Sequence, residues 1–383
     1  MKQKYHSLID KVYSTENLYK SWEQVKANKG APGVDNITIS MFEKTLLWFI
    51  TILHHLLQKG RYKPRPVKRV MIPKPNGDKR PLGIPTVRDR VVQTALRNVL
   101  EPIFERIFLD CSYGFRPNRN CHQAIEKIQE YIGNGYRYVI DADLKSYFDT
   151  IDHEILIDMV AEEVADGRVL QLIRDMLKSG VLHGDIFEKT TKGTPQGGVI
   201  SPLLANIYLH HFDKAMTNRG FKIVRYADDF VILCRTRNEV NRAKKVMQRV
   251  VEGELKLTIH PTKTRVRTVE QGFSFLGFDI YQTKTVPQKA KVMKFKDKVR
   301  ELTRRAQPIK TKDIIARLNK TIIGWGNYFK IGNVKSLFRT LDGWIRMRVR
   351  SFIKKGKSRN HNWQIPNKCL FGLGMRTLYN LTL

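Results

Sequence analysis

Residues 221–234 read FKIVRYADDFVILC, in which two adjacent aspartates, Asp228 and Asp229, interrupt an otherwise apolar stretch. The runs on either side predict two strands, and aspartate tolerates turn geometry, so the pair is expected at the tip of an antiparallel hairpin. An acidic hairpin tip is also a common structural feature, and short motifs carry a high risk of false matches. The pair therefore needs a second site of the same kind before it indicates chemistry.

A second acidic site ends another apolar strand, at residues 138–149 (YVIDADLKSYFD). Strand alternation puts Asp141 and Asp143 on one face, and an aromatic pair follows them. Mg²⁺ prefers hard oxygen ligands and keeps substrate phosphates in its coordination shell, so carboxylates from two separate strands suit it. Two such ions can activate an attacking 3′-hydroxyl and stabilise the leaving pyrophosphate. Together the two acidic sites predict metal-assisted nucleotidyl transfer.

Between the acidic sites lies a glycine-rich segment, residues 193–206 (GTPQGGVISPLLAN). Its glycines let the backbone approach a ligand closely, and Gln196 offers both a donor and an acceptor. Ser201 and Pro202 are expected as the N-cap and first residue of a helix. From these residues alone, a plain entry from a loop into a helix is the simpler interpretation.

Charge points to a polyanionic partner. The chain of 383 residues carries 69 Lys plus Arg against 36 Asp plus Glu, a formal net charge of +33. Nucleic acid is the first candidate and an anionic membrane surface the second.

The most apolar run, residues 46–57 (LLWFITILHHLL), is shorter than the roughly 20 residues that a bilayer crossing needs, so a buried or interfacial helix is expected. The start lacks the apolar core of a signal peptide, and the four cysteines never approach CxxC spacing. These features predict a cytoplasmic protein that binds no membrane.

The order of elements predicts an α+β fold. Residues 1 to about 60 show helical patterns, and a basic hairpin rich in Pro and Gly follows, before two further helices. From about 136 to 291, short strands alternate with helices, which indicates a mainly antiparallel sheet. Beyond Lys291 three basic amphipathic helices are expected, with Trp325 and Tyr328 in their core.

These motifs resemble those of reverse transcriptases, in particular the ones encoded by bacterial group II introns. Asp143 matches the metal-binding aspartate of the family's first palm motif, and Asp228 and Asp229 match the acidic pair of its Y-x-D-D box. The resemblance implies that these three residues are catalytic and bind two Mg²⁺ ions. Phe148 falls where the family holds an aromatic steric gate, which would select dNTPs and argues against an RNA-dependent RNA polymerase.

Further contacts with the nucleotide follow from the same resemblance. Lys74 and Arg80, in the basic hairpin, match residues that the family uses on the triphosphate, and Gln196 lies in the motif beside the incoming nucleotide. The residues themselves give weaker support, because in so basic a chain a given Lys is more often a solvated surface group.

The resemblance covers nearly the whole chain and implies a right-hand polymerase with fingers, a palm built on an antiparallel sheet, and an α-helical thumb. It divides the chain into an N-terminal extension (1–60), fingers (61–140), palm with part of the fingers (141–290), and thumb or maturase X domain (291–383). The segments NKGAPGVD (28–35), SYGFRPNR (112–119), FLGF (275–278) and GWGNYF (324–329) also match. A compact form without an endonuclease region is expected, because none is visible before Leu383.

The implied function is RNA-directed DNA synthesis with dNTPs on an RNA template, from a DNA or RNA primer. A maturase role, in which a structured group II intron RNA is bound and its splicing assisted, can accompany it. The alternative is a domesticated reverse transcriptase that serves host defence or DNA repair, and a gene without surrounding intron RNA would favour it. The apolar run at 46–57 could mark the face of a homodimer.

Overall fold

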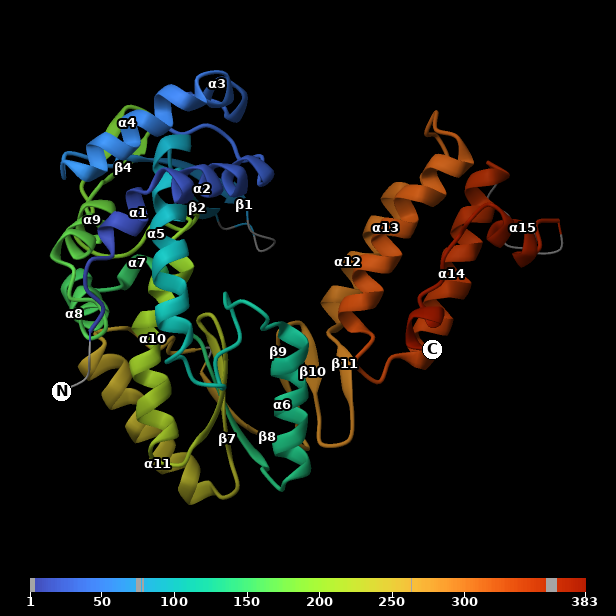
Figure 1. The fold of residues 1–383 in the computed structure, drawn as a ribbon. Coiled ribbons are helices and arrows are strands. Elements are labelled where there is room, and N and C mark those ends of the chain that lie inside the picture. Colours follow the sequence, from blue (N-terminus) through green and yellow to red (C-terminus); the bar gives the residue numbers. More distant parts are fainter. Residues whose placement is uncertain (1–3, 74–76, 78, 263, 356–363) are drawn as a thin grey trace. The chain divides into compact units, whose positions relative to one another are not determined.

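The computed structural model describes residues 4–73, 77, 79–262, 264–355 and 364–383. The chain divides into two compact units (Figure 1). Unit 1 comprises Met1–Ala124 and Ile140–Val266, and unit 2 comprises Ile125–Val139 and Arg267–Leu383. Within the described ranges, no helix has the length and apolar character needed to cross a membrane.

The N-terminal part of unit 1 is helical, as predicted. Its helices are α1 (Ile9–Tyr13), α2 (Thr15–Ala27), α3 (Ile39–Lys44), α4 (Leu46–Gln58) and α5 (Val87–Glu105). The Trp22 ring is fully buried and stacks on Phe42 at 4.9 Å between ring centroids. The apolar run forms α4 as expected: one face, with Leu53, is buried, while Leu47 and Trp48 on the other are 72% and 60% exposed.

The predicted basic hairpin of unit 1 is present as β1 (Val67–Pro73) and β2 (Lys79–Ile84), which pair antiparallel. β1 also pairs in parallel with β4 (Val181–His183), and β5 (Ile186–Glu188) completes a sheet of order β2-β1-β4-β5. Lys74, which follows β1 in the sequence, lies outside the described residues.

A second four-stranded sheet carries the acidic segments, in the order β6-β7-β3-β8. The strands β6 and β7 form the predicted antiparallel hairpin, and β7 is buried at every residue after its first. The strands are β3 (Tyr138–Ala142), β6 (Lys222–Tyr226), β7 (Asp229–Cys234) and β8 (Arg265–Thr268). The remaining elements between α5 and β9 are the helices α6 (Cys121–Gly133), α7 (Tyr147–Thr150), α8 (His153–Ala161), α9 (Gly167–Leu177), α10 (Ser201–Thr217) and α11 (Arg237–Gln248), and a π-helix at Arg249–Glu254.

The C-terminal part of unit 2 opens with a small antiparallel sheet and continues as helices. Trp325 stacks on Phe295 at 4.4 Å and lies 5.7 Å from Phe338, while the Tyr328 ring lies 5.7 Å from Phe278. Both residues pack among aromatic side chains as predicted, but each is half-buried and neither belongs to the fully buried core. The elements are β9 (Phe273–Phe275), β10 (Phe278–Ile280), β11 (Thr285–Pro287), α12 (Lys289–Leu302), α13 (Thr311–Phe329), α14 (Lys335–Ile353), α15 (Asn367–Gly372) and a 3₁₀ turn at Tyr379–Thr382.

The expected N-cap of α10 is wrong by one residue. Ser201 is the first residue of the helix, and the N-cap is Ile200, which makes no side-chain cap. The Ser201 hydroxyl instead donates to the Pro195 carbonyl at 2.9 Å and accepts from the Thr194 hydroxyl at 2.7 Å. The serine therefore fixes the glycine-rich loop rather than the helix end.

Candidate active site

The tip of the β6–β7 hairpin is a two-residue loop, because Tyr226 pairs with Asp229 across it. Ala227 has φ 59°, in the left-handed region that non-glycine residues seldom adopt. Asp228 follows it and is half-buried, whereas Asp229 begins β7 and is exposed. The predicted acidic hairpin tip is thus present, and its strained first residue needs support from its surroundings.

Much of that support comes from Arg225, whose side chain is fully buried beneath the tip. Its guanidinium donates to the Asp213 carboxylate at 2.8 Å, to the Asn206 side-chain oxygen at 2.9 Å and to the Ala227 carbonyl at 2.9 Å. Burial alone would lower the pKa of Arg225, but the Asp213 carboxylate outweighs it and the pKa is raised. The positively charged Arg225 guanidinium therefore stabilises the left-handed conformation of Ala227.

The other side of the tip rests against Gly114. A Cβ at this position would lie 2.3 Å from the Ala227 nitrogen, so only glycine allows this approach. The Gly114 carbonyl accepts from the Asn206 side chain at 2.8 Å, and the Tyr113 backbone N–H donates to the Arg225 carbonyl at 2.8 Å. The segment SYGFRPNR (112–119) therefore packs directly against the acidic hairpin.

The two predicted acidic sites lie on neighbouring strands, because β7 and β3 are adjacent in one sheet. Asp143 directly follows β3, and its carbonyl accepts from the His260 backbone N–H at 2.8 Å. The pKa of the Asp228 carboxyl is raised, first by burial and then by the Asp143 carboxylate, while Arg80 and Arg225 act in the opposite direction. Side chains from three separate segments are thus close enough to interact electrostatically.

A metal-binding cluster of three or more side chains is not formed by His, Cys, Asp or Glu in the described part of the chain. Asp143 and Asp228 converge, while Asp229 is exposed at the start of β7. A pair of carboxylates provides oxygen ligands for a hard divalent cation, and substrate phosphates and water can complete such a coordination shell.

Phe148 lies on α7, and its ring is 8% exposed. Its carbonyl accepts from the Thr194 backbone N–H at 2.7 Å, which fixes the glycine-rich loop to α7. Gly193 has φ 82°, and a Cβ there would lie 2.8 Å from the Asp149 carbonyl oxygen. Close packing of loop and helix therefore brings the predicted gate next to the predicted nucleotide-contacting segment.

Gln196 and Arg80, predicted separately, are hydrogen-bonded to each other: the Arg80 Nε donates to the Gln196 side-chain oxygen at 2.8 Å. The backbones also meet, because the Gly83 N–H donates to the Gln196 carbonyl at 2.6 Å. A Cβ on Gly197 would lie 2.4 Å from the Gly83 oxygen. The basic hairpin and the glycine-rich loop are thus joined within unit 1.

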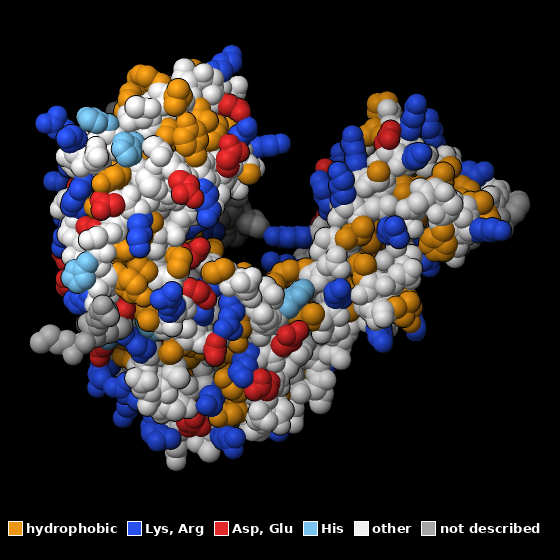
Figure 2. Space-filling model, in the orientation of Figure 1, with side chains coloured by type: hydrophobic (Ala, Val, Ile, Leu, Met, Phe, Trp, Pro, Cys, Tyr) orange, Lys and Arg blue, Asp and Glu red, His pale blue; other side chains and the backbone are white. Residues whose placement is uncertain are grey.

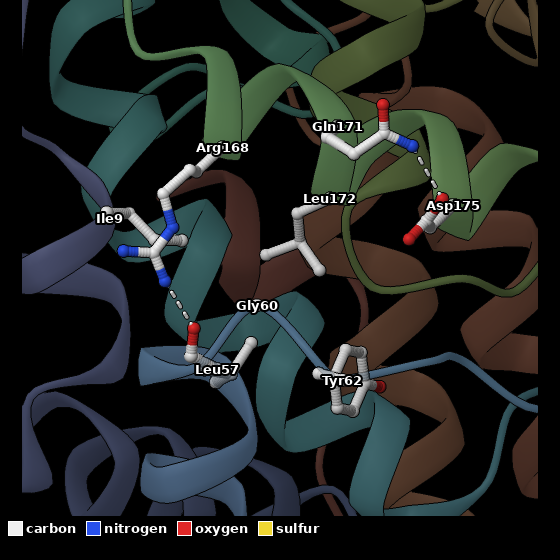
Figure 3. Close-up of a pocket in the computed structure, with 8 residues that line it drawn as sticks. All are labelled: Ile9, Leu57, Gly60, Tyr62, Arg168, Gln171, Leu172 and Asp175. Atoms are coloured by element: carbon white, nitrogen blue, oxygen red, sulfur yellow. Dashed lines mark hydrogen bonds between the residues drawn. The ribbon is translucent and has the colours of Figure 1, made fainter.

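A cavity of about 370 Å³ adjoins this joint, with β1, β2 and β4 on its walls and Asp149 and Gln196 among the residues that line it. A second pocket of about 140 Å³ lies between α1, α4 and α9 (Figure 3). There Arg168 donates to the Leu57 carbonyl at 2.6 Å, so its charge is already engaged. None of the predicted site residues lines this second pocket.

The residues that support the hairpin were not assigned a role from the sequence. Arg225, Asn206 and Gly114 stand in segments quoted above, but no pattern singled them out for this role, and Asp213 lies in the helical stretch that follows Asn206. The signal that could have revealed the buried pair is an arginine in the middle of an apolar strand, since such a charge needs a partner when buried.

Comparison with known proteins identifies two families in this chain. Residues 72–280 match the family described as reverse transcriptase (RNA-dependent DNA polymerase), and residues 292–370 match the group II intron maturase-specific domain.

Two curated relatives and one solved structure are similar to parts of this chain. Protein YkfC of Escherichia coli is 38% identical over 291 residues, which cover 66% of this chain and 76% of that protein. The group II intron-encoded protein LtrA of Lactococcus lactis is 33% identical over 345 residues, 72% of this chain and 57% of LtrA. The chain therefore spans little more than half the length of LtrA. A Cas6-RT-Cas1–Cas2 complex aligns with a TM-score of 0.42 at 25% identity, over 65% of this chain and 43% of that one.

The first family match covers more than half of the chain and contains both carboxylates that converge in unit 1. The predicted right-hand polymerase fold belongs to this family, and the helices and antiparallel strands of the two units agree with it. The maturase-specific match falls on the predicted basic helices of unit 2. The chain belongs to the group II intron reverse transcriptase and maturase family, whose enzymes are RNA-directed DNA polymerases.

Proposed function

We propose that this chain extends a DNA or RNA primer on an RNA template, with attack of the primer 3′-oxygen on the α-phosphate of a dNTP and release of pyrophosphate. The observation that carries the proposal is that Asp143, which follows β3, and Asp228, in the turn before β7, lie on neighbouring strands of one sheet, where burial and the Asp143 carboxylate raise the pKa of the Asp228 carboxyl. A half-buried carboxyl whose pKa is raised by a second carboxylate is stabilised in its charged form by a bound cation.

Two Mg²⁺ ions suit this donor set, with Asp143 and Asp228 as ligands and Asp229 in an assisting position. Bound there, they would activate the 3′-hydroxyl and offset the charge of the leaving pyrophosphate. The chain itself contributes a rigid support, because Arg225 and Gly114 hold the turn that presents Asp228. Most of the catalysis is therefore positioning and charge stabilisation.

The nucleotide-binding roles follow from the residues that surround the carboxylates. Arg80 presents several donors suited to phosphate oxygens, and its hydrogen bond to Gln196 orients both side chains. Lys74, outside the described residues, is assigned to the triphosphate by the family resemblance of its sequence segment. Phe148 excludes the 2′-hydroxyl of a ribonucleotide, so that the enzyme selects dNTPs.

Primer extension on an RNA template with Mg²⁺ and dNTPs tests this proposal, with the isosteric variant Asp228→Asn beside the wild type. Loss of one ligand charge should lower the rate by roughly a thousandfold or more. Asp158→Asn, which changes an exposed aspartate on α8 in the same unit, is the matched control and should keep the wild-type rate. An inactive wild type, or an active Asp228→Asn, would refute the assignment.

A maturase role is the second function that we propose, because residues 292–370 match the maturase-specific domain. The helices of unit 2 carry many basic side chains: Lys296 and Arg300, for example, lie over the Trp344 ring at 5.8 Å and 5.7 Å. Figure 2 shows Lys and Arg side chains scattered over the visible face of unit 2, among hydrophobic and other side chains. The expected partner is a structured group II intron RNA, bound chiefly through its phosphates.

Binding of a group II intron RNA, against an unrelated folded RNA of equal length and at two salt concentrations, tests the maturase role. Asp228→Asn should bind the intron RNA as the wild type does, because this role does not use the carboxylates. Equal affinity for the two RNAs would count against it. A host-defence or repair role has less support, since the maturase-specific match and LtrA both link the chain to introns.

Two further assignments belong to this proposal. The side chains of Met41, Leu47 and Trp48 are 55%, 72% and 60% exposed on α3 and α4, and we assign this face to a homodimer. Sedimentation of the wild type against Leu47→Ser would test it. A cytoplasmic location agrees with the free state of the four cysteines.

A further inference from the structure

Phe115, in the segment SYGFRPNR (112–119), is exposed although it is a large apolar residue. Its exposed fraction is 48%, while both neighbours, Gly114 and Arg116, are buried. Its φ is 60°, so a bulky side chain occupies the left-handed region of backbone conformation. Such outliers persist only where the surroundings enforce them, and they cluster at functional sites.

The surroundings enforce this conformation from both sides. Gly114 is held against the Ala227 nitrogen and by the Asn206 side chain. On the other side, the Arg116 guanidinium donates to the Leu109 and Ser112 carbonyls at 2.7 Å and 2.8 Å, and to the Glu105 carboxylate at 2.7 Å. The backbone at Phe115 therefore cannot relax without the loss of buried hydrogen bonds.

The Phe115 ring contacts the ring of Phe148, the predicted steric gate. The Phe115 and Phe148 centroids lie 6.4 Å apart with the ring planes at 77°, an edge-to-face contact. Phe148 makes a second edge-to-face contact with Tyr147, at 5.4 Å, and the Tyr147 hydroxyl donates to the buried Ala205 carbonyl at 2.6 Å. One support of the gate is thus a fixed, buried tyrosine, and the other is an exposed phenylalanine on a strained backbone.

We propose that Phe115 is a positioning residue for sugar selection: its ring keeps the Phe148 ring at the position where it meets the 2′-hydroxyl of a ribonucleotide. The edge-to-face contact gives the exposed Phe115 ring a role in the site, and the backbone held by Gly114 and Arg116 keeps the ring in place. The inference rests on the proposed function, because it assumes that Phe148 faces the sugar of an incoming nucleotide.

The same geometry links selection to catalysis. Gly114 touches the turn that carries Asp228, and Phe115 is its direct neighbour in sequence. The segment therefore places two parts of the site at once: the acidic turn through its glycine and the aromatic gate through its phenylalanine.

Single-nucleotide incorporation tests the inference through the ratio of kcat/KM for a dNTP to kcat/KM for the matching rNTP. The variants are Phe115→Ala, Phe115→Tyr and, as a reference, Phe148→Ala. We expect Phe115→Ala to lower the ratio roughly five- to tenfold, which corresponds to the loss of one aromatic pair, mainly through a lower KM for the rNTP. Phe115→Tyr keeps the ring and should restore the ratio to within about twofold of the wild type.

Tyr19→Ala is the matched control. Tyr19 is an aromatic residue of α2 in the same unit, 37% exposed, and it belongs to none of the segments assigned to a site or interface. Its variant should leave the ratio of the two kcat/KM values unchanged. If Phe115→Ala fails to fold, as shown by its thermal unfolding, Phe115→Leu takes its place with the same expected fall.

The outcomes separate this inference from the proposed function. A wild type that does not polymerise overturns both. If Phe148→Ala loses sugar selection while Phe115→Ala keeps the wild-type ratio, or lowers dNTP and rNTP incorporation equally, the positioning role of Phe115 fails and the polymerase assignment stands.

Discussion

Two of the hairpins with two-residue loops, β9–β10 and β6–β7, are supported in different ways. The β9–β10 hairpin of unit 2 has Leu276 and Gly277 in its loop, with φ values of 47° and 83°. The β6–β7 hairpin of unit 1 has Ala227 in the left-handed region, with φ 59°, and Asp228 in place of a glycine. Positive φ at both positions with glycine second is typical of a tight hairpin turn, so the first loop is explained by local sequence.

The second loop depends on distant parts of unit 1. Its Ala227 carbonyl accepts from Arg225, which is itself held by Asp213, and its backbone rests on Gly114. In unit 2, the Leu276 carbonyl accepts a single side-chain hydrogen bond, from the Tyr328 hydroxyl at 2.8 Å. A turn that must present a half-buried carboxylate thus requires a support assembled from remote segments, and this difference can be tested.

The largest expected loss of stability follows from breaking the buried ion pair of Arg225 and Asp213. Arg225→Met leaves the Asp213 carboxylate, which is fully buried, without its cation. Removal of one partner from a buried pair costs about 3–5 kcal/mol of the free energy of unfolding. Chemical denaturation, read through signals of unit 1, should show this loss.

The double variant Arg225→Met/Asp213→Leu is the control for that result. Replacement of both charges by apolar side chains should recover most of the stability, because a buried ion pair contributes little net free energy compared with good apolar packing. Primer extension should stay impaired, since Ala227 still lacks its donor. A single variant as stable as the wild type would show that the pair does not support the hairpin.

Acid should weaken unit 1 through His210. This residue of α10 is 6% exposed, and burial lowers its pKa to about 4, with Asp213 acting in the opposite direction. A histidine whose folded-state pKa is lowered stabilises fully above its unfolded pKa, near 6.5, and this contribution is lost as the pH falls toward 4. Over the full pH range, this change in the pKa of His210 lowers the free energy of unfolding by about 3 kcal/mol.

Unfolding free energies of the wild type and His210→Gln between pH 7 and pH 4 measure this effect. The variant should lose less stability over this range, because it lacks the buried group that must become charged. Hydrogen exchange of the two hairpins sharpens the comparison: acid should lower the protection factors of β6–β7 before those of β9–β10. Parallel pH dependence of wild type and variant would contradict the prediction.

Glycine substitutions compare the hairpins directly. In Gly114→Ala the new methyl group meets backbone, 2.3 Å from the Ala227 nitrogen, so the turn must shift. Overpacking of this kind costs about 1–3 kcal/mol, and displacement of Asp228 should also lower the polymerisation rate. In Gly277→Ala the nearest atom is the flexible end of Lys291 at 3.3 Å, so only the left-handed backbone cost of about 1–2 kcal/mol is expected.

Thermal unfolding and primer extension of both glycine variants separate the two cases. Gly277→Ala should reduce stability with little change in the rate. If Gly114→Ala polymerises as fast as Gly277→Ala, the contact between segment 112–119 and the turn does not position Asp228.

Sequence periodicity was sufficient to predict the elements around the site. The hairpin at Asp228, the strand before Asp143 and the three basic helices follow from apolar runs and helical spacing, which are local properties. The helix start at Ser201 was misplaced by one residue, because its hydroxyl bonds to the preceding loop rather than to the helix.

The supports of the site could not be predicted in the same way. Asp213 and Gly114 act on the hairpin from segments far away in the sequence, and the contact of Phe115 with Phe148 depends on side-chain positions. No periodic pattern encodes such contacts. The family resemblance supplied the roles of Arg80 and Gln196, and their direct hydrogen bond became visible only in three dimensions.

The smallest expected effect is at the strained residue itself. Ala227→Gly removes the left-handed cost of a non-glycine residue, about 1–2 kcal/mol, but adds about 0.5–1 kcal/mol of backbone entropy to be lost on folding. A net stabilisation of about 0.5 kcal/mol is therefore expected in the denaturant midpoint of unit 1. Leu276→Gly, at the matching position of the other loop, also removes a half-buried side chain and should instead destabilise unit 2. If Ala227→Gly were destabilising by more than about 1 kcal/mol, the alanine methyl group would have to contribute packing, and Arg225 and Gly114 would not be sufficient to hold the turn.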